Sequence, residues 1–397
     1  MESLKELFKI GIGPSSSHTI GPEKACKKIL ELYPCCKNFS VTLFGSLALT
    51  GKGHGTDVVI KQILGDNVNI IFDTTTTTSH PNTMDICGFD ENQNTIFKKR
   101  IISVGGGKIK FENENIITPI NVYPHNTFEE IKSFCKKENI RLYEYVFKYE
   151  PEIKEYLKTI WSQMKISINE GIVKDGVLPG GLNVERKAKL LYNSNLPNED
   201  EQTKKCRIIS AFAFAVSEQN ASQGTVVTSP TCGSCGVIPA VFYYMYTYEN
   251  ICEDKIINAL ATSGIIGNVI KCNASLSGAE CGCQAEIGSA CAMASAGLAE
   301  IFDMNIEQIE YSAEVSLEHH LGLTCDPVKG LVQIPCIERN AVASMRAIDS
   351  VILAKFLTNS RKISLDLVIK TMYETGKDML FSYKETSKGG LAKMYRC

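Results

Sequence analysis

The sequence predicts an α+β fold, in which a small N-terminal α/β domain (residues 1–145) precedes a mostly α-helical domain (residues 150–397). The chain has 397 residues, of which 44% are hydrophobic, and this length exceeds what one hydrophobic core usually organises. Strand and helix signals alternate as far as about residue 145. From about residue 150, apolar residues recur with the period of a helix. Two domains of different class are therefore expected.

Short strands and helices alternate in the first domain. Three segments have strand character, through apolar–polar alternation or β-branched residues: 39–43, 68–72 and 101–104. Pro22 suits the first turn of a helix, where its missing N–H costs no hydrogen bond. Thr127 and Glu130 have the spacing of a capping box that opens another helix. The threonine run at 74–78 has low complexity, and we expect it in a surface loop.

The second domain follows the helical period from residue 160 to residue 168. Further helices are expected at residues 205–221, 237–250 and 255–271. The segment after Cys283 consists largely of Ala, Gly and Ser, and small residues let helices approach closely, so we expect a buried central helix there. Another helix should follow Asn305, and residues 335–354 should form the next one.

The charge balance and the N-terminal segment bear on partners and location. Lysine plus arginine (42) nearly balances aspartate plus glutamate (44), so a nucleic-acid partner is not expected. The first residues lack the layout of a signal peptide, and no apolar run is long enough to span a bilayer. We therefore expect a cytoplasmic protein without membrane contact.

Sixteen cysteines in such a chain favour reduced thiols over a disulfide scaffold, and nine of them fall between Cys232 and Cys336. Cys283 and Cys336 lie at expected helix amino termini, where the helix dipole favours thiolate, and Cys325 lies where a helix stops. Thiolates bind iron–sulfur clusters, and three of them would leave one iron of a 4Fe-4S cluster open as a Lewis acid. From spacing alone, the alternative that these are inert core cysteines is as well supported as the cluster interpretation.

Three other cysteines are weaker candidates for metal binding. Cys232 and Cys235 form a close pair, but no second pair follows at zinc-site spacing, so packing explains them better than metal binding. Cys397 ends the sequence after a Gly389–Gly390 turn that lets the tail swing inward. On its own it identifies no site.

A serine-rich loop precedes the first helix. Ser15, Ser16, Ser17 and His18 follow a Gly-Ile-Gly-Pro turn, and hydroxyls and free amides at a helix start suit a carboxylate or phosphate. An ordinary helix cap explains the same pattern.

His54 lies between Gly53 and Gly55, which suggests that it is exposed on a loop just after a strand. Because histidine titrates near neutral pH, such a residue can act as a general base. Merely solvated loop histidines have the same appearance, and this alternative applies also to His80 and to the pair at 319–320.

Longer blocks of the sequence resemble the single-chain bacterial iron–sulfur L-serine dehydratases (L-serine deaminases). The blocks are Gly-Ile-Gly-Pro-Ser-Ser-Ser-His at 11–18, Gly-Ser-Leu-Ala-Leu-Thr-Gly-Lys-Gly-His at 45–54, Gly-Leu-Thr-Cys-Asp-Pro at 322–327, and residues 273–284, 332–341 and 372–391. They extend from near the start of the chain to its carboxyl end, so chance agreement does not explain them.

The resemblance implies a helical catalytic domain joined to an α/β domain related to regulatory amino-acid-binding modules. It implies that L-serine loses water and then ammonia to give pyruvate, in a lyase that forms a homodimer. The implied ligands of the 4Fe-4S cluster are Cys283, Cys325 and Cys336, with Cys397 on the fourth iron until substrate displaces it. His54 matches the position that removes the α-proton, the loop from Ser15 to His18 matches one that binds substrate, and His80 matches a further position of the site.

The chain also departs from this pattern. It is shorter than typical relatives, mainly between Asp57 and His80, so a lid or regulatory contact made there is in doubt. Cys232, Cys281 and Cys291 match none of the ligand positions.

Two alternatives remain open from the sequence, and a third is disfavoured. An L-cysteine desulfidase would use the same cluster type on cysteine, and a non-catalytic iron–sulfur sensor would keep the tail cysteine as a permanent ligand. A pyridoxal-phosphate enzyme is disfavoured, since no convincing lysine with a glycine-rich phosphate loop is found.

Overall fold

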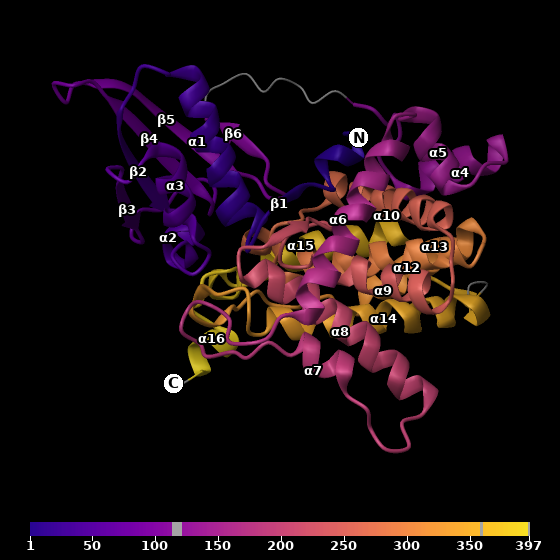
Figure 1. Cartoon of the computed structure of the whole chain (residues 1–397). Coiled ribbons are helices and arrows are strands. Elements are labelled where there is room, and N and C mark those ends of the chain that lie inside the picture. Colours follow the sequence, from indigo (N-terminus) through magenta and orange to yellow (C-terminus); the bar gives the residue numbers. More distant parts are fainter. Residues whose placement is uncertain (113–120, 358–359, 396–397) are drawn as a thin grey trace.

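The computed structural model describes residues 1–112, 121–357 and 360–395, and it confirms the α+β architecture (Figure 1). A small sheet domain, indigo to purple at the upper left of Figure 1, adjoins a larger helical body. The C-terminal segment, in yellow, returns beneath the sheet domain at α16 (Gly390–Met394).

The sheet domain has the strand order β3-β2-β4-β5-β6. The strands are β2 (Asn38–Phe44), β3 (Asn69–Asp73), β4 (Thr83–Phe89), β5 (Thr95–Ser103) and β6 (Ile109–Phe111). The helices are α1 (Gly21–Leu32), α2 (Gly45–Thr50) and α3 (Thr56–Leu64). β2 and β3 are parallel because α2 and α3 connect them as a crossover, and the other neighbours are antiparallel.

One face of this sheet packs against α1 and α3. Alternate residues of β2, including Val41 and Leu43, point to that face and are fully buried with Ile29 of α1 and Ile60 of α3. The sheet domain therefore has its own hydrophobic core.

The helical body contains long helices packed around α12. Its helices are α4 (Phe128–Glu138), α5 (Leu142–Tyr149), α6 (Ile153–Val173), α7 (Ala188–Asn193), α8 (Glu201–Ala221), α9 (Val237–Tyr248), α10 (Glu253–Asn273), α11 (Gly278–Cys281), α12 (Ser289–Ile301), α13 (Ile306–Glu318), α14 (Cys336–Leu357) and α15 (Leu365–Asp378). Every residue of α12 is buried, which confirms the predicted central helix. A Cβ at Gly297 would come within 2.8 Å of Ala259 O in α10, so only glycine allows this close approach.

The first residues of the chain belong to the helical body and not to the sheet domain. β1 (Ile10–Ile12) pairs in antiparallel fashion with β7 (Thr225–Val227), although more than 200 residues separate them in sequence. Leu4, Leu7 and Phe8 are buried in the same hydrophobic core as the long helices. The chain therefore starts on the body, crosses to the sheet domain and returns (Figure 1).

Most predicted elements are confirmed within a few residues. Pro22 lies in the first turn of α1, and Thr127 with Glu130 forms the capping box of α4. The threonine run at 74–78 lies in the loop between β3 and β4. β4 and the short strands β1, β6 and β7 were not predicted from the sequence.

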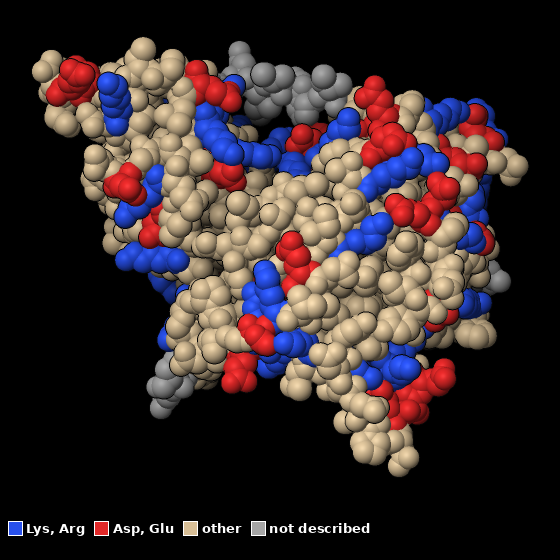
Figure 2. Space-filling view, viewed as in Figure 1, with Lys and Arg blue, Asp and Glu red and all other residues tan. Residues whose placement is uncertain are grey.

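Charged residues of both signs are intermixed on the face shown in Figure 2, in keeping with the net charge of −2. Among the residues that the structure describes, no helix combines the length and the apolarity needed to cross a membrane.

Candidate active site

A narrow buried cavity lies where the sheet domain, the helical body and the C-terminal segment meet. Its lining residues are Pro14, Ser15, His54, Gly233, Cys283, Glu286, Ile287, Cys325, Pro327, Val332, Cys336 and Glu385. The three cysteines predicted as ligands thus share one cavity with His54 and Ser15.

Each of the three cysteines enters the cavity from the end of a helix or from the loop that follows one. Cys283 immediately precedes the short helix Gln284–Gly288 that continues into α12, and Cys336 is the first residue of α14. Cys325 lies in the loop after α13. All three side chains are buried, and the sulfurs of Cys283 and Cys325 lie within 4.8 Å of each other.

Arg339, in the first turn of α14, supplies positive charge beside these thiols. Its guanidinium donates hydrogen bonds to Thr324 O (2.8 Å) and to Asp326 Oδ1 (3.0 Å). A hydrogen bond from the Cys325 thiol and the charge of Arg339 together lower the pKa of Cys283 to about 6, against the opposing effect of burial. Donating that bond raises the pKa of Cys325. A thiolate is therefore favoured at Cys283, as a metal ligand requires.

Glu286 was not predicted from the sequence, yet its carboxyl group adjoins the thiols. Its Oε2 atom lies 3.9 Å from Cys283 Sγ. The group occupies space left by two glycines, since a Cβ at Gly278 would lie 2.7 Å from Oε2 and one at Gly233 would lie 3.3 Å from Oε1. Burial, and then the negative charge of Cys283, raises its pKa to about 8.

The serine loop contains the helix cap that the sequence allowed, and one of its residues also lines the cavity. Ser15 caps the short helix Ser16–Ile20, because its Oγ accepts a hydrogen bond from His18 N at 3.1 Å, and it also lines the cavity. Ser17 Oγ lies 2.8 Å from His18 Nδ1. Ser16 is buried, but it does not line the cavity.

His54 is not exposed as its glycine-rich loop suggested, since only 1% of the residue is accessible. Thr19 Oγ1 donates to His54 O at 2.8 Å, and Gly53 packs directly on the backbone of Gly330. The loop therefore folds inward against the helical body. Burial lowers the pKa of His54 to about 4, which keeps the imidazole neutral at neutral pH.

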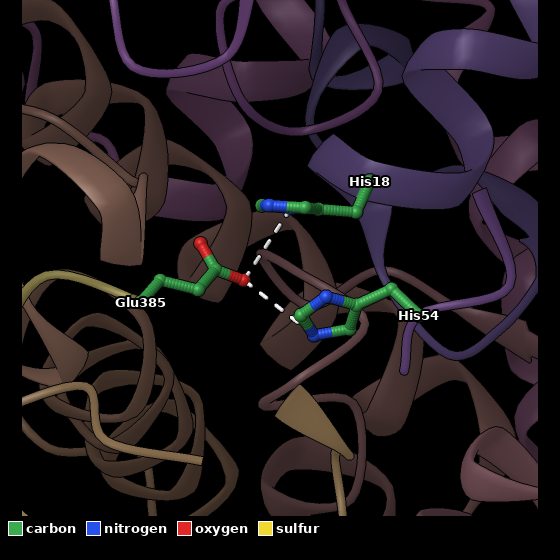
Figure 3. Close-up of side chains that lie close together, drawn as sticks. All are labelled: His18, His54 and Glu385. Carbon is green, nitrogen blue, oxygen red and sulfur yellow. Dashed lines mark ion pairs between the residues drawn. The ribbon is translucent and has the colours of Figure 1, made fainter. Parts of the chain in front are cut away.

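Glu385 approaches both histidines from the C-terminal segment (Figure 3). Its Oε1 atom lies 3.5 Å from His18 Nδ1 and 3.8 Å from His54 Nε2. The segment is held by Cys325, whose N–H donates to Tyr383 O and whose carbonyl accepts from Glu385 N, both at 2.8 Å. Burial raises the pKa of Glu385 well above its usual value. The only sequence signal for this residue was its place in the block 372–391.

His80 does not line the cavity. Its Nε2 lies 3.1 Å from Glu280 Oε1, and its Nδ1 accepts a hydrogen bond from Asn82 N. Asn82 is fully buried, and neither polar atom of its amide has a hydrogen-bond partner in the described structure. The sequence analysis did not single it out.

Among the described residues, the other cysteines discussed above do not line the cavity. Cys232 and Cys235 are buried in an apolar cluster with α8, which agrees with the packing interpretation. Cys291 is buried inside α12, where its thiol donates a hydrogen bond to Ala343 O, and Cys281 packs against Gly376. Cys397 lies outside the described residues.

Comparisons with known proteins cover nearly the whole chain. Residues 3–67 match the family model described as serine dehydratase beta chain, and residues 66–392 match serine dehydratase alpha chain. The two matches meet within the sheet domain, between α3 and β3.

Full-length relatives are similar to the chain over their entire extent. It is 40% identical to an L-serine dehydratase of Haemophilus influenzae and 38% identical to L-serine dehydratase 1 of Escherichia coli, with 100% of both chains covered in each case. An L-serine dehydratase of Helicobacter pylori is 38% identical, over 100% of this chain and 99% of its own. This protein therefore belongs to the serine dehydratase family, in the single-chain form that joins the beta-type and alpha-type regions.

Proposed function

We propose that this protein is an L-serine dehydratase, a lyase that converts L-serine into pyruvate and ammonia. The observation that carries the proposal is the cavity in which an imidazole of the N-terminal region faces three cysteines of the helical body. The full-length similarity to L-serine dehydratases supports it.

We further propose that Cys283, Cys325 and Cys336 hold a 4Fe-4S cluster. The donor set supports this, because three buried sulfurs share one cavity and Arg339 offsets thiolate charge. The position of α16 supports Cys397 as a displaceable fourth ligand. Leu391 N in this helix donates a hydrogen bond to Asp326 Oδ2 at 2.7 Å, and Asp326 directly follows Cys325 in the sequence. When bound, the cluster would supply an iron with an open position that polarises the β-hydroxyl of serine.

The chain's own residues would perform the rest of the elimination. His54, neutral and buried, takes the α-proton through Nε2 as the Cα–H bond breaks. The Cβ–O bond breaks and the hydroxyl group takes up one proton to leave as water; release of the α-proton from His54 balances this uptake and restores the neutral imidazole, and aminoacrylate leaves the site. Its imine tautomer then reacts with water to give pyruvate and ammonia.

The substrate needs a partner for its carboxylate. Ser15, with the amides at the start of the helix Ser16–Ile20, suits this group, and Ser16, Ser17 and His18 shape that loop. His80 does not line the cavity, so in this proposal it supports the substrate site indirectly, from the loop in which its Nδ1 accepts a hydrogen bond from Asn82 N. Each of these roles is part of the proposal.

Anaerobic reconstitution with iron and sulfide, followed by a pyruvate assay on L-serine and on L-cysteine, tests this function. We expect pyruvate from serine in proportion to bound iron. Iron-loaded protein that forms pyruvate only from cysteine would instead identify a desulfidase, and iron-loaded protein that forms none from either would reject the lyase assignment.

Replacement of the base gives a second test. His54→Ala should lower kcat by about 100-fold to 10,000-fold, as loss of a general base does, while iron content stays at the wild-type level. Near-normal kcat in this variant would remove His54 from the role.

A further inference from the structure

The hydrogen bonds behind His54 determine which of its ring nitrogens carries the proton. His54 Nδ1 lies 3.2 Å from Thr50 Oγ1, and Thr50 Oγ1 donates a hydrogen bond to Ser46 O at 3.0 Å. A hydroxyl has a single proton, so Thr50 can only accept from His54. Nδ1 is therefore the protonated nitrogen, and Nε2 holds the lone pair.

The local fold places Nε2 toward the cavity. Thr50 is the last residue of α2 and is 2% exposed, and the N–H of His54 donates to Thr50 O at 3.1 Å. This turn places the imidazole of His54 beside the hydroxyl of Thr50. The opposite ring nitrogen then lies on the Glu385 side, as Figure 3 shows.

Ser46, one turn earlier in α2, acts on His18 in the same way. Its hydroxyl donates to Glu385 O at 2.7 Å, so it can only accept at its 3.0 Å contact with His18 Nε2. The two hydroxyls of α2 thus set the tautomers of both histidines in the site.

We propose that Thr50 is a positioning residue of the elimination, which holds His54 in the tautomer whose Nε2 accepts the α-proton. This rests on the proposed role of His54 as the base. In the other tautomer, Nε2 would present an N–H to the substrate, and it could not accept a proton.

Thr50→Val tests the proposal, since valine keeps the shape of threonine and lacks the hydroxyl. Loss of one orienting hydrogen bond should lower kcat by about tenfold. KM for L-serine and iron content should stay within twofold of wild type. The isotope effect on kcat with α-deuterated serine should rise, because proton removal becomes slower relative to the other steps. Thr50→Ser, which restores the hydroxyl, should restore kcat.

Thr262→Val is the matched control, because Thr262 is also fully buried and its hydroxyl donates to Glu300 at 3.0 Å, outside the cavity. Its kcat should not change. Thr50→Ala serves as a second variant if valine impairs folding.

Wild-type kcat in both Thr50→Val and Thr50→Ala, or a Thr50→Ser variant as slow as Thr50→Val, would overturn the role of the hydroxyl. Comparison with His54→Ala distinguishes failure of the Thr50 role from failure of the His54 role. If His54→Ala is inactive while Thr50→Val is fully active, only the tautomer proposal fails; if His54→Ala is active, the base assignment itself fails.

Discussion

Cys283, Cys325 and Cys336 illustrate what single residues reveal before a structure is known. The positions of Cys283 and Cys336 at helix amino termini were predicted correctly, whereas Cys325 lies in the loop beyond Glu318, where α13 ends. Convergence on one cavity was not predictable from spacing, because it depends on how α12, α13 and α14 pack.

Cys283→Ala should abolish stable cluster assembly, since only Cys325, Cys336 and the displaceable Cys397 would remain to hold a cubane. We expect iron and acid-labile sulfide to fall by about tenfold or more after anaerobic reconstitution. Cys291→Ala is the control, because Cys291 is buried in α12 away from the cavity and should retain iron. Full iron content in Cys283→Ala would reject this residue as a ligand.

Glu385 and Glu286 could not be found from the sequence for a physical reason. Glutamates are usually solvated, and nothing local marks one whose carboxyl group lies beside buried imidazoles or thiols. Their placement results from contacts far apart in sequence, such as the pairing of Tyr383 and Glu385 with Cys325. The family resemblance covered the block 372–391, which contains Glu385, but did not single out this residue.

At the scale of elements, the N-terminal segment connects the two parts of the molecule. Glu2 forms ion pairs with Lys108, which precedes β6, and with Lys271 of α10 at 2.8 Å. Burial alone would raise the pKa of Glu2, but hydrogen bonds and charges from both lysines outweigh it and lower the pKa to about 2. This carboxylate therefore stabilises the contact between sheet domain and body.

Stability from Glu2 should depend on pH with a definite sign. Because the folded pKa lies below the unfolded value near 4.5, the contribution is fully present above pH 4.5 and is lost as pH falls toward 2. Glu2→Gln should cost about 2 kcal/mol at pH 7. The difference in urea midpoint from wild type should narrow at pH 3.5. A difference that is constant over this range would contradict the ion-pair explanation.

Apart from β4, the elements that sequence reasoning missed were short strands. β1 and β7 have three residues each, too few to show an alternation, and their partners lie more than 200 residues apart. Long helices such as α10 and α12 were found because many residues repeat the same period.

For the whole molecule, activity depends on how the sheet domain docks on the helical body. His18 and His54 come from one part and the three cysteines from the other. The docking is tight at Gly53, where a Cβ would lie 2.8 Å from Lys329 O and would also meet the carbonyl of Gly330.

Gly53→Ala should separate these surfaces by a few tenths of an ångström and displace His54 from the thiols. Because small misplacements of catalytic groups are costly, we expect kcat to fall by about tenfold or more with iron content unchanged. Lys52→Ala, on the exposed neighbour in the same loop, should leave kcat near wild type. Wild-type turnover in Gly53→Ala would show that the docking tolerates extra volume.

The burial of Leu4 and Phe8 against Gly264 of α10 has a consequence for synthesis on the ribosome. These side chains are synthesised more than 250 residues before Gly264, the residue of α10 that they contact. At the elongation rates of about 5–20 residues per second, they wait for tens of seconds while residues 38–111 can already form their sheet. A segment that is synthesised before the sheet domain thus reaches its native place only after that domain can fold.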